Sequence, residues 1–290
     1  MKILRVVLWG VVLLLSGFAA FGFAAQSSLT DQDAFVADMQ NAITNPTVQA
    51  EVQAQIRSAT EAALTDLTSQ GGISGSLIGS IDPNTLADAA SSAVDTPAFQ
   101  SAWSSWAALL GQGLADSALG IPNDDVTVQG EIVDVRIGPL VAPLVANSPL
   151  SEFSGVAAGL FGDRTLSINS GEDLEASLSR LGSAAEARWY VLAVAILVVV
   201  ALVVFVPPRL GSLAGALAGA AIGVALAAVA LLLGGQSGGQ SPTPALSSAI
   251  SEAFTGGNIW PLLLVALLLA VIAMGVAVIA RRSARTTPAG

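Results

Sequence analysis

The sequence predicts a membrane protein that is mainly α-helical, with four transmembrane helices plus an α-rich extracytoplasmic domain containing a small β-hairpin or three-stranded sheet. Hydrophobic residues make up 53% of the 290 residues and charged residues only 11%, whereas soluble domains carry about 25% charged residues. Four apolar stretches are also close to the length of roughly 20 residues that a helix needs to cross a bilayer. They are 6–25, 189–206, 210–233 and 259–280.

The charges predict the topology. Six of the eleven basic residues flank the spans with no acid among them: Lys2, Arg5, Arg209, Arg281, Arg282 and Arg285. Of the 21 acids, 20 lie between Asp31 and Glu186, and the last is Glu252. Because basic segments stay inside, we expect a multi-pass plasma-membrane protein with cytoplasmic N- and C-termini.

This topology divides the chain into four parts. They are an N-terminal transmembrane anchor (1–25), an extracytoplasmic domain (26–187), a three-helix transmembrane region (188–280) with an outer loop at 235–258, and a basic cytoplasmic tail (281–290). The alternative for the first span is a cleaved signal peptide. We favour a retained anchor because its apolar run of 20 residues exceeds the about 7–15 of a signal peptide.

The first half of the extracytoplasmic domain has helical signals. Asp31 can cap a short helix that Asn45-Pro46 ends, and a longer helix follows from about 47 to 69. Two further helices begin at Asp82-Pro83 and Thr96-Pro97, where proline suits the first turn.

The second half predicts strands. Residues 126–128 and 133–137 alternate at period two around Gln129-Gly130-Glu131, as a β-hairpin does, and 165–169 is a candidate third strand. Three prolines divide 139–160 into short helical pieces. A leucine stripe from Leu174 then predicts a helix that continues directly into the second span, which would couple the domain to the membrane.

The outer loop contains one more helix. Thr243 is its expected N-cap and Pro244 its first residue, and Leu246, Ile250 and Phe254 repeat at helical spacing. We expect it to pack under the extracytoplasmic domain; the alternative is that it lies flat on the membrane.

Three stretches resemble actinobacterial four-span integral membrane proteins of uncharacterised function, which have a large extracytoplasmic domain between the first and second spans. They are the Phe99-x3-Trp103 helix, the strand pair at 128–140 and the strand and helix at 166–181. The chain departs from them at Ser104-Ser105-Trp106, where they tend to carry Asn and His. The resemblance implies this layout and no activity.

The composition argues against most kinds of catalysis and metal binding. The chain has no Cys and no His, and its single Lys is Lys2, so thiol, imidazole and zinc chemistry are excluded. We expect no enzyme activity, no cofactor and no metal; the acidic pairs Asp31/Asp33 and Asp124/Asp125 lack the spacing of a calcium loop. A net charge of −10 also argues against binding nucleic acid.

The third span carries glycine at every fourth position: Gly211, Gly215, Gly219 and Gly223. Such a stripe, a glycine zipper, lets a second helix approach backbone to backbone. We expect it to pack against a neighbouring span, with the valine-rich second span as the counterpart. The alternative is the seam of a homo-oligomer.

Phe99, Trp103 and Trp106 share one face of a predicted helix. An aromatic stripe at this spacing is typical of a core; the alternative is an interaction surface for lipid or glycan. The only polar side chains in the spans are Ser16 and Ser212, with Tyr190 at an interface, which favours a dry bundle.

These observations favour a non-enzymatic accessory or scaffold whose acidic extracytoplasmic domain binds another envelope or membrane protein, with the lipid bilayer as its other partner. Two alternatives remain open. One is a small transporter or channel lined by the glycine stripe, and the other is a lipid- or glycan-binding envelope module.

Overall fold

The computed structural model describes residues 2–70, 96–146, 162–170, 173–206, 209–236, 245–255 and 259–285. The chain is mainly helical with a small antiparallel sheet, as predicted. It divides into two compact units, which we call the spanning unit (Met1–Thr30, Arg180–Ser237 and Thr255–Gly290) and the acidic unit (Asp31–Ser179 and Gly238–Phe254).

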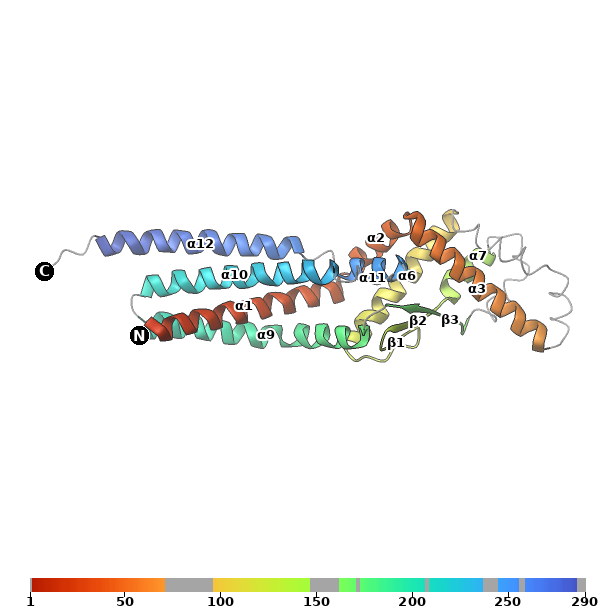
Figure 1. The fold of residues 1–290 in the computed structure, drawn as a ribbon, viewed down its shortest axis with the longest axis horizontal. Helices are drawn as coiled ribbons and strands as arrows, with labels where there is room; N and C mark the ends of the chain where they lie inside the picture. Colours follow the sequence, from red (N-terminus) through yellow and green to blue (C-terminus); the bar gives the residue numbers. More distant parts are fainter. Residues whose placement is uncertain are drawn as a thin grey trace. The chain divides into compact units, whose positions relative to one another are not determined.

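Four helices build the spanning unit (Figure 1): α1 (Lys2–Thr30), most of α9 (Leu174–Phe205), α10 (Arg209–Gln236) and α12 (Ile259–Arg285). Each is long and apolar enough to cross a membrane, which confirms the four predicted spans. Their outward residues are large and apolar, as expected of helices that face lipid rather than water.

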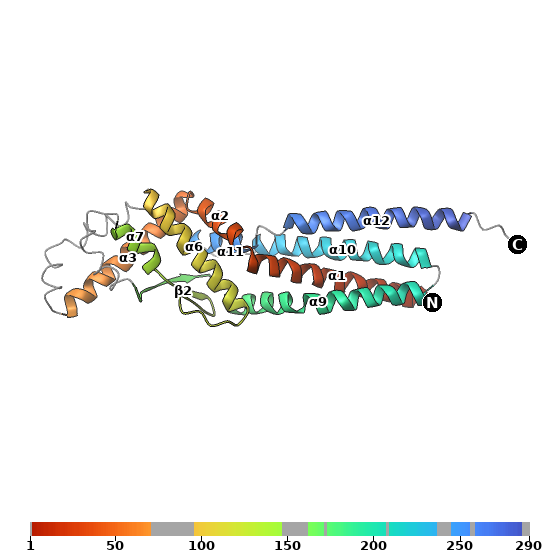
Figure 2. The same cartoon turned by 180° about the vertical axis from the view of Figure 1, so that it is seen from behind.

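Small residues occupy the contacts between these helices. Ala20 and Ala24 of α1, Ala228 of α10 and Ala266 of α12 share one buried cluster. In Figures 1 and 2, α12, α10, α1 and α9 follow one another across the unit. The second span joins through another cluster, in which Leu202 packs with residues of α1 and α10.

The second span continues an earlier helix without a break. α9 begins at Leu174, where the Asp173 side chain accepts a hydrogen bond from the Ala176 N–H at 3.0 Å, and runs to Phe205. The structure therefore confirms that the leucine-rich helix leads directly into the second span.

The described residues of the acidic unit form four helices before and between its strands: α2 (Gln32–Ala42), α3 (Pro46–Gln70), α6 (Pro97–Ala118) and α7 (Gly138–Ala146). Asp31 caps α2 and Thr96 caps α6, each accepting a backbone N–H three residues ahead. The helix expected at 82–83 and most of the pieces expected in 139–160 lie outside the described residues.

Three strands form an antiparallel sheet in the order β1-β2-β3: β1 (Val126–Gln129), β2 (Ile132–Arg136) and β3 (Thr165–Asn169). Val133 and Val135 are buried while their neighbours face outward, the alternation that predicted these strands. Gly130 turns the hairpin with φ +59°, a conformation that glycine adopts readily.

The last element of the acidic unit comes from the loop between the third and fourth spans. This element is α11 (Ala245–Thr255), which belongs to the same compact unit as α2 to α7. The expectation that it packs with the large domain is confirmed, and the domain therefore includes 238–254 as well as residues 31–179. The expected caps at Thr243 and Pro244 lie outside the described residues.

Candidate functional site

The centre of the acidic unit is the aromatic face of α6. Phe99 and Trp106 have no exposed surface and Trp103 has 1%. The Trp103 ring lies 5.9 Å from Phe99 and 5.1 Å from Trp106, measured between centroids, within the range in which aromatic pairs attract. The three rings therefore form one continuous stack inside the unit.

Both indole N–H groups in this stack are satisfied by backbone. Trp103 Nε1 donates to the Met39 carbonyl at 2.9 Å, and Trp106 Nε1 donates to the Arg136 carbonyl at 3.1 Å. The first bond ties α6 to α2 and the second ties α6 to β2. Each tryptophan thus supplies apolar volume and a specific link between elements.

Two glycines let other elements reach the stack. A side chain at Gly111 would lie 2.7 Å from Phe35 of α2, and one at Gly113 would overlap Val126 of β1. These close approaches are what bury Phe35 and Val126 to 3% exposed each. The absence of side chains at these positions therefore sets the depth at which α2 and the sheet dock on α6.

The aromatic face is consequently a core and not an interaction surface. A lipid or a glycan can stack only on rings that solvent reaches, and Phe99, Trp103 and Trp106 are enclosed by α2 and the sheet. The alternative of an exposed platform at these residues is wrong, and the core interpretation is confirmed.

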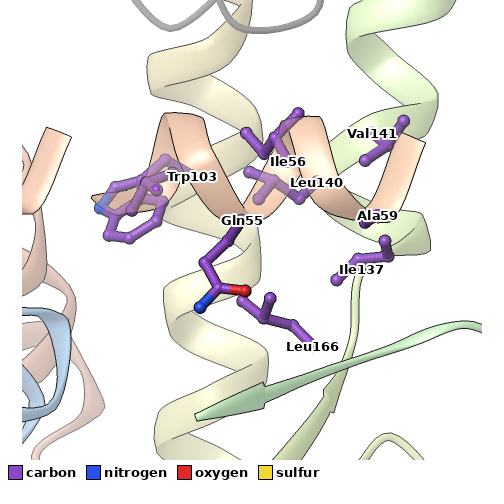
Figure 3. Close-up of a pocket in the computed structure, with 9 residues that line it drawn as sticks. Gln55, Ile56, Ala59, Trp103, Ile137, Leu140, Val141 and Leu166 are labelled. Carbon is purple, nitrogen blue, oxygen red and sulfur yellow. The ribbon is translucent and has the colours of Figure 1, made fainter. Parts of the chain in front are cut away.

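A small cavity lies beside Trp103, between α3, α7 and β3 (Figure 3). Its volume of about 10 Å³ is close to the least that a single water needs. The lining is apolar except for Gln55, and includes Ile56, Ile137 and Leu140. Ligand sites are some thirty times larger, so this cavity is a packing defect.

The described charged side chains of the acidic unit lie at its surface. The unit contains 20 acids and three arginines, a net charge of −17. The carboxylates of Asp31, Asp33, Asp124, Glu131 and Asp173 lie on residues classed as exposed. Among the described residues, the buried polar side chains are Ser212 and Ser247, so no described acid is buried.

Arg57 and Arg136 face carboxylates. Arg57 pairs with Glu61 at 3.2 Å, one turn along α3. Arg136 lies 3.1 Å from Asp125 and 3.9 Å from Asp163. These pairs are between one-third exposed and fully exposed, so they stabilise the unit only weakly and leave a large excess of negative charge.

The acids do not assemble a metal site in the part of the chain that the structure describes. Asn123, directly before Asp124 and Asp125, instead accepts the N–H groups of Asp125 and Val126 and donates to Asp116 at 2.8 Å. This side chain shapes the turn into β1, which is the usual role of asparagine in loops.

Two carboxylates hold elements of the acidic unit together. Glu175 accepts the Gly130 N–H at 2.9 Å, while the Gly130 carbonyl accepts the N–H groups of Leu174 and Glu175, so the hairpin turn is bonded to the start of α9. Glu51 of α3 accepts the N–H of Leu246 at 3.0 Å. It therefore caps α11 across 195 positions of sequence.

The glycine stripe lies in the spanning unit, where α1 covers it. A side chain at Gly215 would overlap the Trp9 ring, and one at Gly223 would overlap the Leu13 carbonyl and Ser16. Gly17 of α1 also permits this close approach, because a Cβ added there would lie 3.0 Å from the Gly223 carbonyl oxygen. Close packing within one chain is therefore what the stripe does in this structure.

The counterpart of the stripe was predicted wrongly. The second span, α9, contributes Leu202 to a cluster with Val12 and Ala216, whereas Gly215, Gly219 and Gly223 lie against α1. The physical reason is that α1 carries glycine at position 17 and so permits backbone approach, while α9 presents bulky valines. The same contact covers the surface proposed for a homo-oligomer seam.

The two serines of the spans are bonded within the bundle. Ser16 Oγ donates to Leu13 at 2.9 Å and reaches Ala220 of α10 at 3.3 Å, and Ser212 Oγ donates to Val206 at 2.7 Å. Neither hydroxyl therefore lines a polar path through the described helices.

Comparison of the chain with models of protein families, with curated proteins and with solved structures gives no match.

Sequence reasoning missed the docking role of Gly111 and Gly113 and the cap that Glu51 provides. The glycines lie two residues apart inside a helix that is otherwise favourable, a departure from helix propensity that could have drawn attention to them. Nothing local to Glu51 indicates its partner, because that partner lies on a loop between two spans.

Proposed function

We propose that this protein is a non-enzymatic scaffold of the plasma membrane, in which the spanning unit anchors an extracytoplasmic acidic unit that binds another envelope protein. The observation that carries the proposal is the separation of charge between the two units. The acidic unit has a net charge of −17, whereas the spanning unit has eight basic residues against the single acid Glu186.

The acidic unit favours a binding role over a catalytic one. Its largest side chains fill its own core, and the cavity beside Trp103 holds at most one water. Its described carboxylates lie outside the core, so they are available to a partner. A surface of this charge attracts a basic partner over long range, and such attraction weakens as salt rises.

The topology of the proposal places both termini in the cytoplasm, because Lys2, Arg5 and Arg281 flank the spans at the ends of the chain. The chain has no natural cysteine, so single-cysteine variants report the side of each residue without ambiguity. Asp124→Cys tests the acidic unit, and Ser283→Cys tests the C-terminal end of α12.

In intact cells, an impermeant thiol reagent should label the Asp124→Cys variant and should label the Ser283→Cys variant only after lysis. The reverse pattern would overturn the topology and the scaffold with it. If the topology holds, cross-linking in native membranes should capture a basic partner whose yield falls about tenfold or more between about 50 and 500 mM salt. A salt-independent yield would contradict the binding mode.

A further inference from the structure

The end of the spanning unit at which the chain begins gathers the ends of three helices. Trp9 of α1 packs against Gly215 of α10, and Gly17 packs against Gly223, so α1 and α10 run in parallel. α12 runs the other way, because Leu262 near its start shares a cluster with Ala228 near the end of α10. The starts of α1 and α10 therefore lie at the same end of the unit as the end of α12, which extends beyond them (Figure 2).

Six basic residues lie in the terminal turns of these helices, at the end of the unit that we call the basic end. Lys2 and Arg5 lie in the first turns of α1, and Arg209 begins α10. The last two turns of α12 add three more: Arg281, Arg282 and Arg285. The only acid in the sequence of the spanning unit is Glu186, which lies in the first half of α9 and so at the opposite end.

Exposed hydrocarbon adjoins these cations on the same helices. On α1, Val6 and Val7 are 64% and 55% exposed and directly follow Arg5. On α12, Val278 and Ile279 are 50% and 59% exposed immediately before Arg281. Arg281 and Arg282 are themselves exposed. The basic end thus offers positive charge and apolar surface within two helical turns.

These two properties together select one class of ligand. A free phosphate satisfies the cations and leaves the valines in water, and a neutral phospholipid covers the valines without a net charge for the arginines. We propose that the basic end binds anionic glycerophospholipid, with the headgroup phosphate at Arg281 and Arg282 and the acyl chains along α12 beside Val278 and Ile279. Guanidinium groups suit this role because they pair with phosphate through two parallel hydrogen bonds.

The proposal is tested with the purified full-length chain in detergent. Dioleoyl phosphatidylglycerol and dioleoyl phosphatidylcholine, which share acyl chains, are titrated separately and bound lipid is measured by native mass spectrometry. Phosphatidylglycerol, the anionic lipid, should bind at least about tenfold more tightly than phosphatidylcholine. Each removed cation should weaken its binding roughly fivefold, so Arg281→Gln should lose about fivefold and Arg281→Gln with Arg282→Gln about 25-fold.

A matched control comes from the opposite end of the same unit. Arg180→Gln removes one exposed arginine near the start of α9 and should leave phosphatidylglycerol binding unchanged. Arg281→Lys keeps the charge and should keep most of the affinity, which separates loss of binding from loss of folding. Inorganic phosphate at the same concentration should not displace the lipid.

Three results would overturn the proposal. Equal binding of the two lipids would show that the headgroup charge is not recognised. An equal loss in Arg180→Gln would show a general charge effect. Displacement by inorganic phosphate would show that the basic end is a soluble-anion site with no role for the hydrocarbon.

Discussion

The acidic unit and the spanning unit fill their interiors with opposite kinds of residue. The acidic unit packs large rings, with Trp103 and Trp106 fully enclosed and their N–H groups bonded to backbone. The spanning unit packs small residues, with Gly17 against Gly223 and Ala24 near Ala228. The two units should therefore tolerate different changes in the volume of a buried side chain.

The difference follows from the surroundings that each unit is suited to. In water, large apolar side chains gain most from burial, because stabilisation grows with the apolar area removed from solvent. In lipid the surroundings are as apolar as the side chains, so helices associate through close van der Waals contact that small residues permit. Large-to-small changes should thus damage the acidic unit, and small-to-large changes should damage the spanning unit.

The largest effect is expected for Trp103→Ala. It removes a ring with 1% exposure together with the hydrogen bond to Met39, and we expect the acidic unit to lose about 3–5 kcal/mol of its free energy of unfolding. Denaturation of the full-length chain in detergent, followed by near-ultraviolet circular dichroism, measures this loss. Trp260→Ala, at a ring that is 74% exposed, is the control and should leave the acidic unit unchanged.

A loss below about 1 kcal/mol at Trp103 would show that the ring is not a core residue in solution. In that case the comparison between the two units fails at its strongest point, and an accessible aromatic face has to be considered again.

The next largest effect is expected for Gly223→Leu. Its side chain would occupy the space of the Leu13 backbone and of Ser16, so we expect α1 and α10 to separate at a cost of about 1–3 kcal/mol or more. Gly275→Leu is a matched control on α12, where an added Cβ meets nothing within 4 Å. Thermal unfolding in detergent, with a cysteine cross-link between α1 and α10 as a second readout, measures the difference.

Equal stability of the two leucine variants would contradict the contact between α1 and α10. A change in oligomer size on a native gel for Gly223→Leu alone would instead favour the homo-oligomer seam over packing within one chain.

These two predictions also show what the sequence could and could not specify. The start of α6 and the bounds of β3 were predictable because their signals are local: Thr96 caps the helix and alternation at period two marks the strand. The aromatic core was predictable for the same reason, since Phe99, Trp103 and Trp106 repeat on one helical face.

Pairing between distant elements was not predictable in the same way. The glycine stripe indicates that some helix comes close, but α1 and α9 are both strongly apolar, with mean hydropathies of 2.3 and 2.6, so hydropathy does not say which helix does so. In the acidic unit, α11 is bonded to α3 through Glu51, which is separated from Leu246 by 195 positions. No local pattern reports a contact at such a distance.

A smaller effect is expected for Glu51→Ala. The variant removes the carboxylate that accepts the Leu246 N–H at the start of α11, and the loss of such a cap costs about 1 kcal/mol. Hydrogen exchange of the α11 amides should become about fivefold faster while exchange in α6 stays the same. Glu61→Ala removes an exposed acid from the same helix and serves as the control.

If α11 exchanges at the same rate in both variants, the link between Glu51 and α11 does not contribute to docking. The boundary of the acidic unit at residues 238–254 then depends on the buried side chains of Leu246 and Ile250 alone.

The smallest effect is expected for Ser16→Ala, which removes a side-chain hydrogen bond between α1 and α10. Ser16 Oγ lies 3.3 Å from the Ala220 carbonyl and closer, at 2.9 Å, to Leu13 of its own helix. Because the shorter of these two hydrogen bonds lies within α1, we expect the free energy of unfolding to fall by at most about 0.6 kcal/mol. Gly10→Ala, where an added Cβ meets nothing, is the control in the same thermal unfolding experiment. A loss above about 2 kcal/mol at Ser16 would mean that polar contacts, and not the approach of glycines, hold the spanning unit together.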